Sequence, residues 1–346
     1  MGISVKIQNA GLLTTIQDCG RDAHLASALS RGGAQDPDAL AIANLLVGNT
    51  IDAAGLEITG LGPSLFFEND VVVACFGAPV RAIILNAEKN QRRFPQGRPV
   101  VVQAGSTVKF SSFIRGFRAW IAFAGGIESP LVLGSRSSHL AGEIGPPRLE
   151  NNSLVTLGPD AREKTQRMMD ILRAQQAMDS REARSAPEYV NGSWSIANHL
   201  LDQWPVLSIP AFKGRHFEAL GASEQTALLK QEWGVGARSN RQGLALEGRA
   251  LITKGMPAIA SEPVRFGTVQ LPPGGKPFIL MAEHQTTGGY PRVLEVASTA
   301  RPLLAQASPE SRLRFELIDH TQSAQLAKRQ AKDRELTRYA LERTIS

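Results

Sequence analysis

Short apolar runs separated by turn-forming residues dominate the first 158 positions of this 346-residue chain. The runs are rich in valine, isoleucine and phenylalanine, and glycine, proline or asparagine interrupts them about every ten residues. Seven of them predict strands: SVKIQ, SLFFE, VVVACF, RAIILN, RPVVVQ, STVKFSSF and FRAWIAFA. Strands at this spacing favour a β-barrel or β-sandwich over alternating β-α-β units.

One helix is predicted within this first β region, over DPDALAIANLLVGN. Asp36 suits the N-cap and Pro37 the first helical position, and Gly48 ends the helix. A cap role for Asp36 is favoured over contact with a ligand. The apolar positions that can face a core are Leu40, Ala43, Leu45 and Leu46.

Residues 159–190 differ in character, because 12 of these 32 residues are charged. Apolar side chains nevertheless recur at helical spacing, at Met168, Ile171, Leu172 and Met178. This pattern predicts a partly amphipathic helix in a linker, with its methionines used for packing and not for a cofactor.

The second half returns to β character in WPVLSIPAF, LALEGRALI, FGTVQLP and PFILMAE, with helices predicted at SEQTALLKQEW and TARPLLAQA. From about Thr321 the chain reads as a charged helix that docks through Leu326, Leu336 and Tyr339. We therefore expect a mainly β protein with some α structure. Its predicted divisions are a β domain over 1–158, a helical linker over 159–190, a second β domain over 191–318 and a terminal helix over 319–346.

Composition narrows the function classes. The net charge is +6 and the pI about 9.5, but the basic residues are scattered and no aromatic-basic stripe suggests a nucleic-acid partner. Two distant cysteines indicate neither a disulfide framework nor a zinc ribbon, and favour a reducing compartment. No apolar stretch is long enough to cross a membrane. The expectation is a cytoplasmic protein without a membrane partner.

Common catalytic and nucleotide motifs are missing. The sequence has no GxxxxGK[ST], no GxGxxG between a strand and a helix, and no GxSxG. Its six histidines never occur at HxxxH spacing, so we expect no metal site. If ATP is used, the chain does not show a motif of its own for binding it.

Four clusters instead place polar side chains beside glycine: TTIQDCGRDAH, GGIESPLVLGSRSS, ARSNRQGLALEG with ASEPVRFG, and EHQTTGGYP. Each cluster contributes an arginine, namely Arg21, Arg136, Arg241 and Arg292. A guanidinium binds carboxylates in two-point fashion, and threonine, glutamine and tyrosine suit an amide or ureido group. Each arginine alone is better explained by a structural salt bridge, but together they predict a site for a small amide or carboxylate substrate.

Candidate proton carriers lie in the same clusters. Glu283 and His284 are adjacent, so on a strand they would point to opposite faces and only one could enter a pocket. Glu262 is a second candidate carboxylate, with a loop salt bridge as an equal alternative. Asp18, next to Gly20, is also explained by a turn.

Taken together, TTIQDCGR, GAQDPDALAIANLLVGN with LEITGLGP, AFAGGIESPLVLGSRSS, and HQTTGGYP followed by LLAQ resemble the allophanate hydrolase subunit 2 family. This family is also called the biotin-dependent carboxyltransferase family and includes the C subunit of 5-oxoprolinase and the carboxyltransferase region of urea carboxylase. The resemblance spans roughly residues 5–316. It implies two cyclophilin-like β-barrel domains and a partner of similar fold, called subunit 1.

In this family the polar motifs converge on a cleft. The resemblance implies that substrate is bound by Gln17, Asp18, Arg21, Arg136, Gln285, Thr286, Thr287 and Tyr290 and that Arg241 belongs to the same site. The chain departs from the family in having Glu283 and His284 before QTTGGYP in place of Asp-Arg, Asn240 in place of an aspartate, and IPAFKGR in place of a GPQ segment. We expect Glu283, His284, Arg241 and Glu262 to be catalytic and Asn240 to contact substrate.

The leading hypothesis is a subunit of a heteromeric ATP-dependent amidohydrolase, similar to the C subunit of 5-oxoprolinase and acting on a small cyclic amide or ureido compound. No intrinsic cofactor is expected, and ATP would enter through the complex. One alternative is a urea carboxylase-like carboxyltransferase subunit, with biotin on a separate carrier protein. The other is a non-catalytic regulatory partner of subunit 1. Self-association is left open.

Overall fold

The computed structural model describes residues 2–179, 192, 194–196 and 204–345, and its strands form two large sheets, a closed barrel and a short two-stranded sheet. A six-stranded sheet has the order β11-β1-β4-β9-β6-β7. Its strands are β1 (Ser4–Asn9), β4 (Ser64–Phe67), β6 (Val80–Leu85), β7 (Gln91–Arg93), β9 (Thr107–Phe113) and β11 (Leu154–Thr156). A five-stranded sheet has the order β2-β3-β10-β5-β8. Its strands are β2 (Leu13–Gln17), β3 (Gly55–Thr59), β5 (Val71–Gly77), β8 (Val100–Val102) and β10 (Arg118–Phe123).

The second half forms the closed barrel, in the order β12-β19-β16-β17-β14-β13-β20. Its strands are β12 (Val206–Lys213), β13 (Trp233–Val235), β14 (Gly243–Glu247), β16 (Thr268–Gln270), β17 (Phe278–Leu280), β19 (Arg292–Val296) and β20 (Arg312–Leu317). Parallel pairing of β12 with β20 closes it, and β15 (Glu262–Pro263) pairs with β18 (Thr287–Gly288) in a separate two-stranded sheet. The predicted mainly β fold is confirmed.

Side chains alternate between the two faces of a strand, and in the first half both faces of the continuous apolar strands are covered by other elements. In β5, Val71, Val73 and Cys75 enter the core between the two sheets. Val72 and Ala74 point the other way, into a second core under the helices. The barrel encloses a third core around Trp233. These layers explain why the VVVACF run lacks polar positions.

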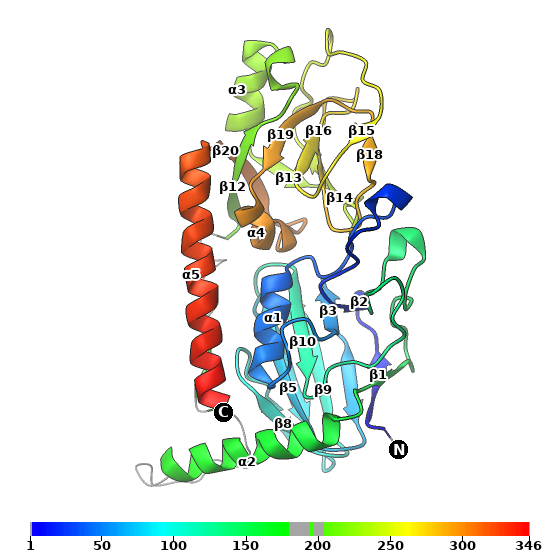
Figure 1. Ribbon diagram of the computed structural model, residues 1–346, viewed down its shortest axis with the longest axis vertical. Coiled ribbons are helices and arrows are strands. Elements are labelled where there is room, and N and C mark those ends of the chain that lie inside the picture. Colours follow the sequence, from blue (N-terminus) through cyan, green and yellow to red (C-terminus); the bar gives the residue numbers. More distant parts are fainter. Residues whose placement is uncertain (1, 180–191, 193, 197–203, 346) are drawn as a thin grey trace.

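Helices cover the outer face of the five-stranded sheet and the ends of the barrel (Figure 1). They are α1 (Pro37–Leu46), α2 (Ala161–Asp179), α3 (Ala222–Lys230), α4 (Arg301–Ala305) and α5 (His320–Ile345), with the 3-10 turns η1 (Leu25–Ser27), η2 (Leu140–Gly142), η3 (Phe217–Ala219) and η4 (Ser298–Ala300). The carboxylate of Asp36 accepts hydrogen bonds from the backbone N–H groups of Asp38 and Ala39, which confirms its predicted cap role.

Helix α5 runs along one side of the molecule, beside both the barrel and α1 (Figure 1). The predicted docking residues are wrong, because Leu326, Leu336 and Tyr339 are 39%, 55% and 58% exposed. Leu341 is the residue that is buried, at 2% exposure. No helix in the described part of the chain is long and apolar enough to span a bilayer.

The predicted linker helix is present as α2 and packs as expected. Met168 and Leu172 are buried in the core that also contains α1. The side chain of Met178 and residues 180–190 lie outside the described residues.

Candidate functional site

A buried ion network joins the two halves of the molecule, and its centre is Arg241, in the turn before β14. Its Nε donates to Glu283, its Nη1 to Glu57, and its Nη2 to the carbonyl oxygen of Gly33 at 2.6 Å. All three charged side chains are 3% exposed or less. Burial alone would lower the pKa of Arg241, but the charges of Glu57 and Glu283 outweigh it and raise the pKa. The guanidinium is thus saturated by anions of the protein itself.

Sequence reasoning missed Glu57, the second anion of this network. It lies in the middle of β3, where every residue is buried. Its Oε2 accepts hydrogen bonds from the Gln35 backbone N–H at 2.7 Å and the Trp120 indole at 3.1 Å. The sequence did contain an indication of this role, because Glu57 is a single carboxylate within an apolar strand and a buried charge requires partners.

Glu283 connects the network to a third segment. Its Oε2 accepts the backbone N–H of Ala141 at 2.9 Å, while its Oε1 accepts from Arg241. One residue earlier, the Ala282 carbonyl oxygen accepts the N–H of Gly32 at 3.1 Å. The third and fourth predicted clusters, through Arg241 and Glu283, therefore meet segments that follow the first two clusters in sequence, at Gly32, Gly33 and Ala141.

Glu283 and His284 do not lie on a strand, because β17 ends at Leu280 and the chain turns. Both side chains are buried, so the expected alternation does not apply. His284 Nδ1 lies 2.6 Å from the Gln285 carbonyl oxygen, which can only accept, so Nδ1 carries the proton. Burial lowers the pKa of His284, with the hydrogen bond to Gln285 opposing. Its Nε2 makes no hydrogen bond within the described chain and is free to accept a proton.

His139, directly after the SRSS motif, is a second histidine at this junction that was not predicted. Its Nδ1 accepts the Gly142 N–H at 3.0 Å, and its Nε2 lies 3.0 Å from Ser30 Oγ. The neutral ring therefore carries its proton on Nε2 and donates it to Ser30. This is the reverse of a histidine that activates a serine nucleophile. Burial lowers the pKa of His139, and Glu283 opposes that effect.

Asp18, Arg136 and Asn240 have local structural partners. Asp18 accepts hydrogen bonds from the Gly20 N–H at 2.8 Å, the Ser135 hydroxyl at 2.6 Å and the Arg136 N–H at 2.6 Å. The Arg136 guanidinium pairs with Glu128 at 3.0 Å. Asn240 Oδ1 accepts the N–H groups of the two positions that follow Arg241, so it forms the turn that carries the arginine.

Gln17 and Arg21 converge on the segment that leads to His139. Gln17 Nε2 donates to the Ser138 carbonyl oxygen at 3.2 Å. Arg21 Nε donates to the Val132 carbonyl oxygen at 3.1 Å and Nη2 to that of Ser137 at 2.5 Å. Gln17 and Arg21 are 0% and 1% exposed, so they form an inner polar layer.

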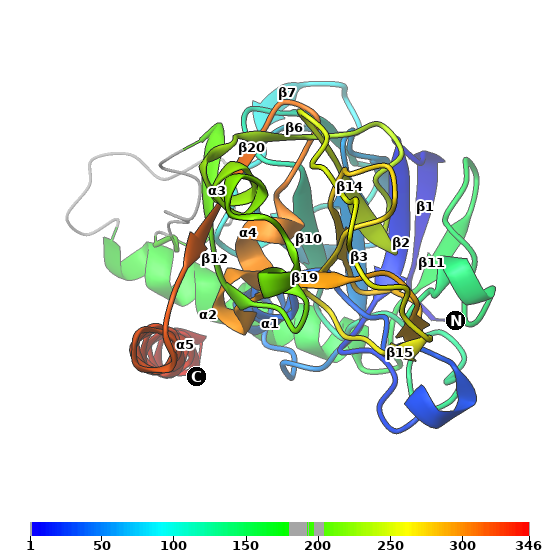
Figure 2. The same cartoon turned by 90° about the horizontal axis from the view of Figure 1, so that it is seen from above.

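Glu262 lies apart from this layer, in the two-stranded sheet of β15 and β18. Its carboxylate is 2.9 Å from the Arg215 guanidinium and 2.8 Å from that of Arg292. The salt-bridge alternative therefore describes its contacts. In both views this two-stranded sheet lies beside the loop that contains η1, so it borders the junction (Figures 1 and 2).

The remaining predicted residues lie in β18 or next to it, and they range from half-buried to exposed. Gln285 is exposed and its Nε2 lies 3.4 Å from Gln270 Oε1. Thr286 is half-buried, Thr287 is exposed and Tyr290 is 45% exposed. Their three hydroxyl groups make no hydrogen bond with the residues that the structure describes, so they are available to a ligand.

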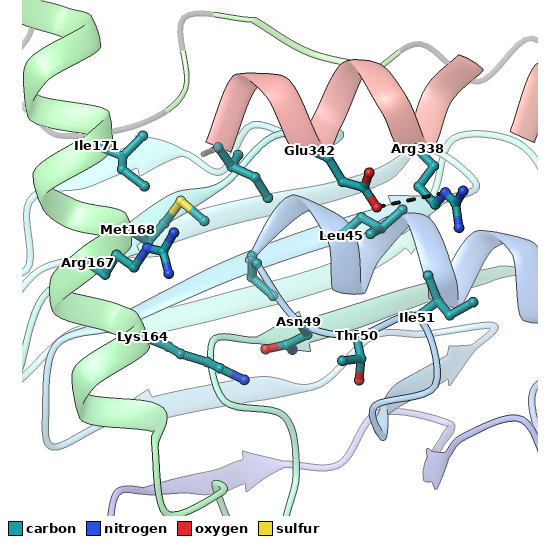
Figure 3. A pocket seen from close by; sticks show the side chains of 13 residues that line it. Leu45, Asn49, Thr50, Ile51, Lys164, Arg167, Met168, Ile171, Arg338 and Glu342 are labelled. Carbon is teal, nitrogen blue, oxygen red and sulfur yellow. Dashed lines mark ion pairs between the residues drawn. The ribbon is translucent and has the colours of Figure 1, made fainter. Parts of the chain in front are cut away.

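The site thus has a buried layer of charges and an accessible layer of hydroxyl groups and His284 Nε2. A cavity of about 580 Å³ lies elsewhere, between α1, α2 and α5, and none of the predicted site residues lines it (Figure 3). No set of three or more His, Cys, Asp or Glu side chains in the described ranges is arranged to hold a metal ion. Cys19 and Cys75 are free thiols.

Comparison with known proteins identifies the class to which this fold and site belong. The family model for the carboxyltransferase domain, subdomains A and B, matches residues 27–317. This chain therefore belongs to that carboxyltransferase family.

Particular relatives refine the comparison. The chain is 33% identical over 306 residues to the C subunit of 5-oxoprolinase from Escherichia coli K12, covering 87% of both chains. It is 32% identical over 143 residues to urea amidolyase of Saccharomyces cerevisiae, covering 41% of this chain and 8% of that protein. The solved urea carboxylase of Kluyveromyces lactis has the same fold, with a TM-score of 0.78 at 21% identity over 97% of this chain and 29% of that one.

Proposed function

We propose that this chain is the counterpart of the 5-oxoprolinase C subunit in an ATP-dependent amidohydrolase that opens a small cyclic amide, with 5-oxoproline as the first substrate to test. The match to that 5-oxoprolinase component carries this proposal, because the two chains correspond over 87% of both lengths, as equivalent subunits would. In urea amidolyase the similar region is a small part of a much longer protein.

His284 is the proton carrier in this proposal. Opening a lactam requires water to add to the carbonyl carbon, the C–N bond to break and the nitrogen to gain a proton. His284 Nε2 is free and its lowered pKa keeps the ring neutral near pH 7, so it can take the proton from water and return it to nitrogen. The hydroxyls of Thr286 and Thr287 supply donors for the developing oxyanion.

Arg241 and Glu283 act as positioning residues in this reaction. Their polar groups are already engaged within the protein, and Glu283 directly precedes His284. A buried charge pair with several hydrogen bonds holds its segment in one conformation, which fixes the neighbouring imidazole.

The ATP-dependent step is assigned to partner subunits, among them a subunit 1-like protein of similar fold. Coupling to ATP hydrolysis supplies the driving force for opening a stable amide. The chain carries no Walker-type loop, in keeping with this division of labour.

The test is 5-oxoproline-dependent ATP hydrolysis by the assembled complex. This chain is combined with the remaining subunits, and phosphate release is measured with and without 5-oxoproline. We expect stimulation that disappears when this chain is omitted. Unstimulated hydrolysis with 5-oxoproline and with other cyclic amides, from a complex shown to assemble, would refute the proposal.

Carboxyl transfer from carboxybiotin is the second candidate, favoured by the similarity to urea amidolyase. A ureido group offers both N–H donors and a carbonyl acceptor, which the free hydroxyl of Thr287 and the amide of Gln285 fit. Calorimetry with biotin tests this: binding should be lost in Thr287→Val and retained in Thr253→Val, where the hydroxyl already donates to the Pro273 carbonyl oxygen. Absence of heat at millimolar biotin would remove this candidate.

A further inference from the structure

One arginine from each glycine-rich cluster is a candidate for anion binding, and the structure distinguishes one of these four. Three are neutralised by carboxylates of the protein: Arg136 by Glu128, Arg241 by Glu283 and Arg292 by Glu262. Arg21 has no carboxylate within ion-pair distance among the described residues. It is therefore the arginine that remains able to bind an external anion.

The Arg21 guanidinium is buried without full compensation. Nε and Nη2 donate to the carbonyl oxygens of Val132 and Ser137, but Nη1 has no hydrogen-bond partner within the described chain, although the residue is only 1% exposed. Burial lowers the pKa of Arg21, and the more distant charges of Asp18 and Glu283 oppose it. A buried cation with an unused donor is costly unless an anion completes its coordination.

Two neighbouring side chains also have unused polar atoms. Gln17 Oε1 and Ser138 Oγ lack partners among the residues that the structure describes, and both residues are 0% exposed. They belong to the same layer, because Gln17 donates to the Ser138 carbonyl oxygen and Arg21 donates to that of Ser137. This inner layer thus offers a guanidinium donor, a hydroxyl donor and an amide acceptor.

Two glycines shape the space around the guanidinium. A Cβ at Gly145 would come within 2.7 Å of Arg21 Nη2, so a side chain there would displace the arginine. A Cβ at Gly32 would lie 3.0 Å from His139 and 3.9 Å from Arg21 Nη1. Both glycines have positive φ values, of 76° and 64°, which other residues rarely adopt.

One partner of Arg21 belongs to a segment at the protein surface. The guanidinium donates to the carbonyl oxygen of Val132, whose neighbours Leu131 and Leu133 are 63% and 48% exposed. The charge of Glu283, which directly precedes His284, acts on Arg21, so the layer lies near the loop that carries His284.

We propose that Arg21, Ser138 and Gln17 form the subsite for the carboxylate and adjacent N–H of an α-amido acid. The guanidinium and hydroxyl donate to the carboxylate, and Gln17 Oε1 accepts the N–H on the neighbouring carbon. A cyclic α-amido acid such as 5-oxoproline carries a carboxylate and an N–H on the same carbon. The choice of this ligand rests on the proposed function, whereas the set of binding groups is independent of it.

The test compares 5-oxoproline with its neutral carboxamide, 5-oxoprolinamide, by calorimetry on the full chain or by KM in the assembled complex. Wild type should prefer the carboxylate at least tenfold, which corresponds to about 1.4 kcal/mol. Arg21→Gln should reduce this preference to about one, whereas Arg136→Gln, which alters an arginine already paired with Glu128, should retain it. Because both ligands are measured on the same variant, a general loss of binding cancels.

Ser138→Ala provides a second variant if Arg21→Gln does not fold, and it should reduce the carboxylate preference severalfold. An unchanged preference in a folded Arg21→Gln protein, or no carboxylate preference in wild type, would overturn the subsite. The latter result would mean that ordered water alone satisfies Arg21.

Failure of the subsite and failure of the proposed function give different results. One outcome is a complex that hydrolyses no cyclic amide while N-acetylglycine, an open-chain α-amido acid, still binds through Arg21. That result would refute the proposed function and support the subsite. If 5-oxoproline-dependent ATP hydrolysis occurs with the same KM in Arg21→Gln, the function stands and the subsite falls.

Discussion

Arg241 contacts Glu57 across a sequence separation of 184 residues, and this buried contact joins the barrel to the five-stranded sheet. Glu283 completes the network from the loop after β17. The same charges that hold the halves together therefore border the loop that carries His284.

Removing Glu57 should destabilise the whole molecule. Glu57→Leu leaves Arg241 with one fewer anion and leaves the Gln35 N–H and the Trp120 indole without their acceptor. Breaking a buried ion pair costs about 3–5 kcal/mol, and we expect a loss of that size in the free energy of unfolding from urea titration. The exposed pair of Lys276 and Glu247 is the control, and Lys276→Ala should cause only a small fraction of that loss because solvent screens the pair. Equal losses would show that the buried network contributes no special stability.

His284→Gln should reduce turnover of the assembled complex by about 10²–10⁴-fold, the usual contribution of general acid-base catalysis. Glutamine approximates the size of imidazole but cannot exchange a proton near neutral pH. His320→Gln, at the start of α5, alters a histidine that stacks on Phe212 and should leave kcat unchanged. Wild-type kcat in a folded, assembled His284→Gln complex would exclude His284 as the proton carrier.

Acidification should weaken the fold through His139. The pKa of His139 in the folded protein lies below the ordinary value of 6.5, so below about pH 6.5 the unfolded chain binds more protons than the folded protein does. The stability that depends on the neutral ring is therefore lost as the pH falls from about 6.5 through the folded pKa. Wild type should therefore lose more unfolding free energy between pH 7.5 and 5 than His139→Gln does.

The buried carboxyl of Asp36, whose pKa is raised to about 7, acts in the opposite direction, but it is present in both proteins and cancels in the difference. Urea titrations of the two proteins at several pH values provide the measurement. Parallel stability curves would show that His139 ionises freely in the folded state.

Leu341 should anchor the terminal helix. It is 2% exposed in the core shared with α1, so Leu341→Ala should lower the free energy of unfolding by about 2–5 kcal/mol. Leu336, on the same helix but 55% exposed, gives the matched control, and Leu336→Ala should change stability by less than about 0.5 kcal/mol. A larger loss from Leu336→Ala than from Leu341→Ala would favour the docking face expected from sequence.

Local patterns were sufficient for much of the fold. The apolar runs became strands and Asp36 became a helix cap, because strand burial and capping depend on neighbouring residues. The four glycine-rich clusters were also recognisable, since glycine beside polar groups marks turns that expose backbone and side-chain donors.

The roles within the clusters required contacts between distant segments. Arg21 and Arg241 look equivalent in sequence, yet Glu57 and Glu283 neutralise Arg241, and no carboxylate of the described residues reaches Arg21. The contacts of Glu57 and His139 with the site were likewise invisible in sequence, because their partners lie on other strands and loops.

Sequence by itself therefore determined the strand-rich architecture, the capped helix and the segments that carry polar chemistry, all of which follow from short-range periodicity and backbone preference. Tertiary structure alone decided which charges are paired, which histidine nitrogen is free and which face of α5 is buried. Those properties depend on groups brought within a few ångströms of one another by folding, and spacing along the chain does not encode that proximity.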